Sequence, residues 1–165
     1  MSFDDFDRLL NEDRQSSEPE PVSRWTIVAI DDEPAVRETL SALFRDRYDV
    51  RLAGSAQEGI ALVDEETCAV ILDVKMAGHD GFWACSQIRA KHPDIPVIFY
   101  SAYQDSKDPY RIINEHRPFA FIVKDGSPTK LLDTVDMAVR LQSITVANRQ
   151  MIAALKSEEA KGEAP

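Results

Sequence analysis

The stretch TIVAIDDEP, residues 26–34, holds the pattern that repeats along this chain and decides its fold. A run of mostly β-branched residues from Thr26 to Ile30 is followed at once by three acids and then by Pro34. A short β-branched run indicates a buried strand. Proline is favoured at the first position of a helix, where its missing N–H costs nothing. The stretch therefore predicts a strand that ends in acidic side chains and leads directly into a helix.

Four more short apolar runs follow along the chain, at Val50–Leu52, Ala69–Leu72, Val97–Tyr100 and Ala120–Val123. The segments between them have helical length, and helix starts are marked by Pro109, by Pro128 and by a capping box of Ser55 with Glu58. Five strand-then-helix units predict an α/β fold, an open doubly wound parallel sheet covered by helices on both faces. Ligands of such sheets bind at the carboxyl ends of the strands.

Composition limits the class of protein. The chain has 165 residues, enough for one domain with a full core. Its net charge of −10 argues against nucleic-acid and anionic-membrane partners, which both need clustered basic residues. The two cysteines form no disulfide or zinc pattern, so we expect reduced thiols. No apolar run is long enough to span a bilayer, and the N-terminus is acidic, so we expect a cytoplasmic protein.

The chain divides into three zones. Residues 1–24 are acidic and include SSEPEP, which is typical of a flexible extension. Residues 25–141 contain the five strand-then-helix units. Residues 142–165 continue the last helix as an extension, and we expect a disordered end from Ser157 onward.

An apolar seam runs along this last helix, because its apolar residues alternate spacings of four and three. After Met137 the seam consists of Leu141, Ile144, Asn148, Met151 and Leu155. The pattern favours a homodimer formed through a short coiled coil. In the alternative interpretation, Met137 and Leu141 cover the sheet and the rest of the helix is a solvated tail.

Polar side chains stand where four of the strands end: Asp31 and Asp32, Asp73, Ser101, and Lys124. Each is ordinary alone, but together they predict three carboxylates, a hydroxyl and an ammonium at one edge of the sheet. Crowded carboxylates need a cation, and all-oxygen ligands suit Mg²⁺. An ionised carboxylate can then attack phosphorus while cationic groups and the hydroxyl stabilise the transferring oxygens.

These residues resemble a known family, the receiver domain of bacterial two-component response regulators. The resemblance covers residues 25–141 and rests on DDE at 31–33, LDVKM at 72–76 with Gly81, SA at 101–102 and FIVK at 121–124. It implies the flavodoxin-like strand order 2-1-3-4-5. It also implies that a histidine kinase or a phosphotransfer protein donates the phosphoryl group.

Carried over by position, the resemblance makes Asp73 the phosphoacceptor. Mg²⁺ is then held by Asp32, Asp73 and the backbone carbonyl of Lys75, with Asp31 acting through a metal-bound water. The phosphoryl group is bound by Ser101, Ala102 and Lys124. Phe121 becomes the aromatic switch residue, which moves when Ser101 is drawn inward.

Two positions depart from the pattern of the family. Receivers usually have proline where this chain has Ala77 and again where it has Asp125. Because a cis bond before a residue other than proline costs about 2.5–4 kcal/mol, we expect a trans Lys124–Asp125 bond. The sequence therefore does not decide the reach of Lys124 or the shape of the loop at Asp125 and Gly126.

Two rival functions remain. One is a phosphorylation-independent receiver-like module for interaction or dimerisation. The other is a phosphatase with an aspartate nucleophile, which normally carries a second acid two residues after it, where this chain has Lys75. We therefore expect no turnover of an external substrate. The output is left open between a stand-alone receiver, an adaptor and the front part of a longer protein.

Overall fold

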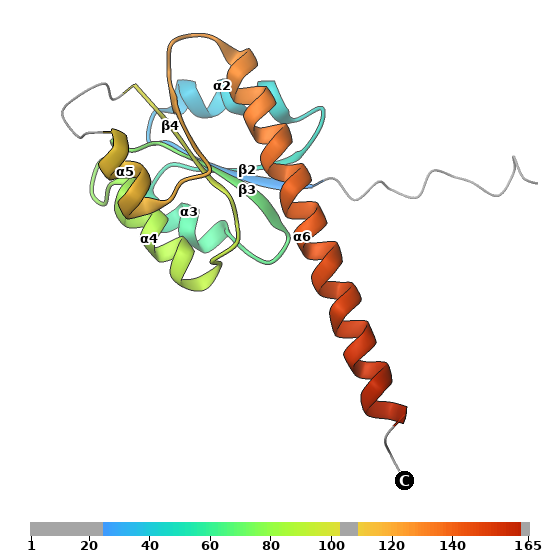
Figure 1. Cartoon of the computed structure of the whole chain (residues 1–165). Helices are drawn as coiled ribbons and strands as arrows, with labels where there is room; N and C mark the ends of the chain where they lie inside the picture. Colours follow the sequence, from blue (N-terminus) through green and yellow to red (C-terminus); the bar gives the residue numbers. More distant parts are fainter. Residues whose placement is uncertain (1–24, 103–108, 163–165) are drawn as a thin grey trace, which may run out of the picture.

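The computed structural model describes residues 25–102 and 109–162 as alternating strands and helices (Figure 1). The strands are β1 (Thr26–Ile30), β2 (Asp49–Ala53), β3 (Thr67–Leu72), β4 (Val97–Ser101) and β5 (Ala120–Val123). The helices are α2 (Pro34–Phe44), α3 (Ala56–Leu62), α4 (Gly81–Lys91), α5 (Pro109–His116) and α6 (Pro128–Gly162). All five predicted strands are confirmed, and the N-terminal extension at 1–24 lies outside the described residues.

The five strands form one parallel sheet in the order β2-β1-β3-β4-β5, which confirms the expected topology. The last residue of β1, Ile30, is aligned with Leu72 at the end of β3. Ser101 at the end of β4 is aligned with Val123 at the end of β5. The residues that follow these strands therefore meet at one edge.

Two hydrophobic cores lie on opposite faces of the sheet. Alternate strand residues point to each side, so that Val28 belongs to one core and Ile27 to the other. Helices α3, α4 and α5 cover the first face, and α2 and α6 cover the second (Figure 1). Because both faces are covered, β1 is buried along its whole length, as its unbroken apolar run predicts.

The predicted helix starts are present at α2, α3, α5 and α6. In α3, the Ser55 hydroxyl accepts from the Glu58 N–H at 3.2 Å, and the Glu58 carboxylate accepts from the Gly54 N–H at 2.7 Å. Helix α2 begins at Pro34 without a side-chain cap from Glu33. Glu33 instead donates its N–H to the Asp31 side chain at 3.0 Å, which places the start of α2 against the acidic edge.

Helix α6 extends well beyond the rest of the domain (Figure 1). Its domain-facing side buries Leu131, Val135, Ala138, Val139 and Gln142. Met137 and Leu141 are 58% and 52% exposed, so the alternative in which they cover the sheet is wrong. The helix also continues to Gly162, and the disorder expected from Ser157 is therefore wrong for residues 157–162.

Within the described part of the chain, no helix is both long and apolar enough to cross a membrane.

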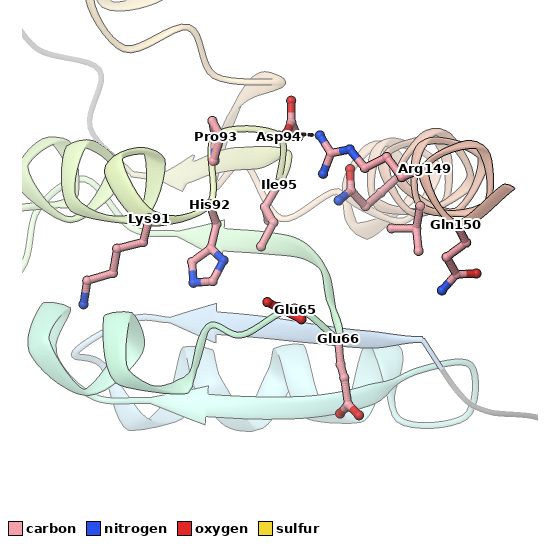
Figure 2. Close-up of a pocket in the computed structure, with 11 residues that line it drawn as sticks. Glu65, Glu66, Lys91, His92, Pro93, Asp94, Ile95, Arg149 and Gln150 are labelled. Carbon is pink, nitrogen blue, oxygen red and sulfur yellow. Dashed lines mark hydrogen bonds and ion pairs between the residues drawn. The ribbon is translucent and has the colours of Figure 1, made fainter. Parts of the chain in front are cut away.

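Polar contacts hold α6 to the domain on two sides. Asp136 accepts from the Tyr48 hydroxyl at 2.5 Å and from Arg47 at 2.6 Å. Farther along, Arg149 pairs with Asp94 across a pocket of about 450 Å³ (Figure 2). This pocket lies by the segments that lead into β3 and β4, at the edge of the sheet opposite the acidic residues. It is thus separate from the predicted site.

Candidate functional site

The predicted site residues meet at the carboxyl edge of the sheet. Asp31, Asp73 and Ser101 are buried, with relative exposures of 1%, 7% and 1%. The Lys124 side chain is 15% exposed, and Asp32 lies exposed at the rim. Strands β1, β3, β4 and β5 are neighbours, so their ends deliver these side chains to a common point.

Asp73 is held by three groups. Its Oδ1 accepts from the Ser101 hydroxyl at 2.8 Å and from the Lys75 N–H at 3.3 Å. Its Oδ2 lies 3.3 Å from Lys124 Nζ. The hydroxyl of Ser101 therefore already points at Asp73 in this structure. Lys75 and Ala102 both lie at the surface, and the prediction for the Lys75 carbonyl is untested by these contacts.

Lys124 makes its shortest contact with Asp31, at 2.6 Å between Nζ and Oδ2. Burial acts to lower the pKa of Lys124, but its hydrogen bond to Asp31 and the charges of Asp31 and Asp73 outweigh burial and raise it. Lys124 is therefore held as an ammonium. Burial also raises the pKa of the Asp31 carboxyl, and bonds from Lys124 and Glu33 only partly offset this effect.

The acids fit a hard divalent cation. One carboxylate oxygen from each of Asp31, Asp32 and Asp73 lies within 4.8 Å of the others. These three carboxylates face one ammonium, and the donor set consists of oxygen alone, as Mg²⁺ prefers. Asp31 is ionised at a cost in its buried position, and a bound cation would lower that cost.

Gly81 permits a close approach of α4 to the Asp73 backbone. A Cβ at this position would lie 2.1 Å from the Asp73 carbonyl oxygen, too close for any side chain. The Gly81 N–H donates to the Val74 carbonyl at 2.8 Å. Gly81 thus has a steric role beside Asp73, the predicted phosphoacceptor.

Both positions that lack the usual proline use their N–H groups. Ala77 donates to Asp32 Oδ2 at 3.0 Å, a contact that the sequence did not predict. Asp125 donates to the Val123 carbonyl at 2.9 Å, and its carboxylate accepts from the Ser127 N–H at 2.9 Å. The described residues contain no cis peptide bond, which confirms a trans Lys124–Asp125 bond.

The predicted switch residue, Phe121, is partly buried in an aromatic cluster. Its ring centroid lies 6.1 Å from that of Phe99, and Phe99 lies 5.3 Å from Phe82 near the start of α4. Phe82 in turn stacks on His116 at the end of α5, with centroids 4.5 Å apart. Phe121 therefore contacts the core that joins β5 to α4 and α5.

The predicted dimer seam faces away from the domain. Leu141, Ile144, Asn148, Met151 and Leu155 are all exposed. The opposite side of α6 carries Gln142, Val146 and Arg149, which line the pocket next to the domain (Figure 2). The seam is thus uncovered within the described chain.

Comparisons with known proteins agree with this geometry. The family model described as response regulator receiver domain matches residues 27–136, two thirds of the chain. The hydrogenase transcriptional regulatory protein HoxA of Cupriavidus necator is 32% identical over 120 residues, which are 72% of this chain and 25% of HoxA. HoxA of Bradyrhizobium diazoefficiens is 30% identical over 117 residues, 70% of this chain and 24% of that protein. The chain thus spans about a quarter of these relatives.

Solved structures share the fold. The response regulator StyR superimposes with a TM-score of 0.73 at 24% identity, covering 81% of this chain and 68% of StyR. The response regulator TrrA from Thermotoga maritima, solved in complex with Mg²⁺ and BeF, gives a TM-score of 0.59 at 27% identity. That alignment covers 68% of this chain and 97% of TrrA.

Proposed function

The chain belongs to the family of response regulator receiver domains, and on that premise we propose that it accepts a phosphoryl group on Asp73. The single observation that supports this most is the meeting of Asp31, Asp32 and Asp73 within 4.8 Å, beside the ammonium of Lys124. In such a site an ionised carboxylate serves as the nucleophile without a separate base.

In the proposed reaction a carboxylate oxygen of Asp73 forms a bond to phosphorus. The bond from phosphorus to the donor atom breaks, and its electron pair leaves with the donor. The donor is a phosphohistidine of a kinase or phosphotransfer protein, or a small acyl phosphate. Lys124 and Ser101, both already in contact with Asp73, stabilise the charge on the transferred oxygens.

Asp31, Asp32 and Asp73 would hold Mg²⁺, together with the backbone carbonyl of Lys75. When bound, the ion neutralises the carboxylates and the phosphoryl oxygens. TrrA, a relative of similar fold, was solved with Mg²⁺ and BeF, which supports this choice of ion.

Phosphorylation would reach the rest of the domain through Ser101 and Phe121. The added phosphoryl oxygens give Ser101 and Lys124 new acceptors. A shift of Ser101 changes the space available to Phe121, which has no hydroxyl and signals only by packing. The aromatic cluster from Phe121 to Phe82 and His116 offers the packing route to α4 and α5.

A shallow pocket beside Lys124 is suited to the donor protein. It has a volume of about 300 Å³ and is lined mainly by apolar atoms of α2 and by Tyr100, Lys124 and Gly126. Lys124 Nζ also lies 5.7 Å from the centre of the Tyr100 ring. A donor seated here would bring its phosphoryl group to the ammonium.

Both cysteines are buried and free, in keeping with the cytoplasmic location expected of such a pair.

The output we propose is a homodimer through the seam of α6. Apolar side chains at heptad spacing on an exposed helix are removed from water when the helix packs against the same helix of a second copy. The domain binds the other side of α6, so two copies can pair without displacing it. A receiver-like module that dimerises without phosphorylation remains the alternative function, and the costly burial of Asp31 argues against it.

Intact-mass measurement tests the central proposal. The full chain is incubated with acetyl phosphate and Mg²⁺, and we expect a gain of one phosphate. EDTA should prevent the gain, and Asp73→Asn should abolish it. A wild-type chain that stays unmodified at high acetyl phosphate, while it binds Mg²⁺, would favour the alternative function.

A further inference from the structure

Asp32 differs from the other two acids in how it is held. Asp31 is bonded to Lys124 and to the Glu33 N–H, and Asp73 is bonded to Ser101, Lys75 and Lys124. Asp32 lies exposed, and among residues 25–102 and 109–162 its carboxylate has one hydrogen-bond donor, the backbone N–H of Ala77 at 3.0 Å. This bond joins the loop after β1 to the loop after β3.

The loop after β3 fixes the direction of the Ala77 N–H. Gly81 anchors its far end by donating to the Val74 carbonyl at 2.8 Å, close against Asp73. Gly78, next to Ala77, has a φ of 81°, in the left-handed region that glycine adopts without strain. With both ends attached to the end of β3, the loop points the Ala77 N–H at Asp32.

We propose that the Ala77 amide is a positioning group for the cation site, a role that rests on the proposed function. A carboxylate has about four acceptor positions, so one N–H leaves Asp32 able to bind a cation as well. An oxygen of Asp32 stays within 4.8 Å of those of Asp31 and Asp73. Holding an exposed side chain in place reduces the entropy that cation binding must remove.

The role depends on the identity of residue 77. Any residue except proline supplies a backbone N–H, and proline has none. Ala77 stands where the resembled pattern has proline, so this chain has a donor to Asp32 that such a pattern excludes. Its departure from the pattern therefore adds a contact to the cation site.

Fluorescence of Trp83 can measure Mg²⁺ affinity in the full chain. The Trp83 ring stacks on His79, with centroids 3.8 Å apart, just after the loop that carries Ala77. The chain has two tryptophans, so Trp25→Phe isolates the signal of Trp83. We expect Ala77→Pro to weaken Mg²⁺ binding about three- to tenfold, as the loss of one hydrogen bond implies. Ala77→Ser keeps the N–H and should bind Mg²⁺ as tightly as the wild-type residue does.

The outcomes separate this inference from the proposed function. If the wild-type chain gives no Mg²⁺ response in fluorescence or melting temperature, the cation site fails and the inference fails with it. If the wild-type chain binds Mg²⁺ but Ala77→Pro binds as tightly as Ala77→Ser, or more tightly, only the inference is overturned.

A second measurement decides the case in which Ala77→Pro does not fold. In ¹⁵N–¹H spectra of the Mg²⁺-free chain, Asp32→Ala should move the Ala77 amide proton upfield, because its acceptor is lost. The Gly126 amide, in the loop before α6, serves as the control and should stay in place. An Ala77 resonance that does not move would overturn the proposal.

Discussion

Lys124 and Asp31 are joined at 2.6 Å, a shorter contact than the 3.3 Å between Lys124 and Asp73. The lysine of the site therefore neutralises the most deeply buried acid first. Its ammonium is one positive charge against three carboxylates, so the cluster keeps a net negative charge within the described site. This imbalance provides the electrostatic reason for a divalent cation.

Asp31→Asn should make the Mg²⁺-free protein more stable. Burial raises the pKa of Asp31, so the ionised carboxylate costs free energy at neutral pH, and an amide removes that cost. We therefore expect a higher free energy of unfolding for the variant at neutral pH without Mg²⁺. The same change should abolish the stabilisation by Mg²⁺. Thermal unfolding with and without Mg²⁺ measures both effects, and an unchanged Mg²⁺ response would contradict the assignment of Asp31.

Gly81→Ala should destabilise the fold by about 2 kcal/mol. The added Cβ would stand 2.1 Å from the Asp73 carbonyl oxygen, so α4 or the end of β3 must move. Gly54→Ala is the matched control, because its Cβ would come no closer than 3.3 Å, to the flexible end of Arg37. Urea unfolding compares the two variants, and equal stabilities would show that the contact at Gly81 relaxes freely.

Much of the fold follows from local sequence. The strand runs were predictable because both faces of the sheet are covered, which requires unbroken apolar stretches such as Thr26–Ile30. The end of α6 was not predicted, although Glu158, Ala160 and Lys161 are all good helix formers. Their helix propensity favours continuation of α6 through this stretch to Gly162.

The sequence predicted which residues lie in the site but not which of them contact one another. Parallel strands deliver the residues after their ends to one edge, so Asp31, Asp73 and Lys124 had to meet there. Which partner Lys124 prefers depends on distances of a few tenths of an ångström, which sequence does not encode. The contact of Ala77 with Asp32 is made by a backbone N–H, so no pattern of side chains in the sequence predicts it.

Ser101→Ala should uncouple Asp73 from the surface formed by α5, β5 and α6. The hydroxyl of Ser101 is the direct link between Asp73 and β4, at 2.8 Å from Oδ1. We expect beryllofluoride with Mg²⁺ to shift amide resonances of β5 and the end of α5 in the wild-type chain, and to shift them much less in the variant. Ser101→Thr keeps the hydroxyl as a control. Equal shifts in Ser101→Ala and wild type would contradict the proposed switch.

Charges on the α6 seam should break the proposed dimer. Leu141→Glu with Met151→Glu places like charges at the proposed interface, and we expect a monomer by light scattering at micromolar concentration. Ala153→Glu lies exposed off the seam and should leave the dimer intact. Deletion of residues 143–165 gives a second test. A wild-type chain that is already monomeric, and unchanged by the deletion, would remove the dimer proposal.

Alkaline pH should weaken the fold through Cys68. Burial raises the pKa of this thiol from 9.0 to about 11, so the folded protein favours the neutral form. This stabilisation is complete below about pH 9 and is lost as pH rises through about 11. Between about pH 8 and about pH 10.5, the wild-type chain should lose about 2 kcal/mol more than Cys68→Ala. Urea unfolding at both pH values measures the difference. Equal losses of stability in the wild-type chain and in Cys68→Ala would contradict the raised pKa of Cys68.

Reductive trapping of the phosphorylated chain tests the identity of the acceptor most directly. Borohydride reduces an aspartyl phosphate to homoserine, which peptide mass spectrometry assigns to one residue. After treatment with acetyl phosphate and Mg²⁺, the proposed mechanism predicts homoserine at position 73 and at no other aspartate. Homoserine at Asp31 or Asp32, with Asp73 intact, would contradict it.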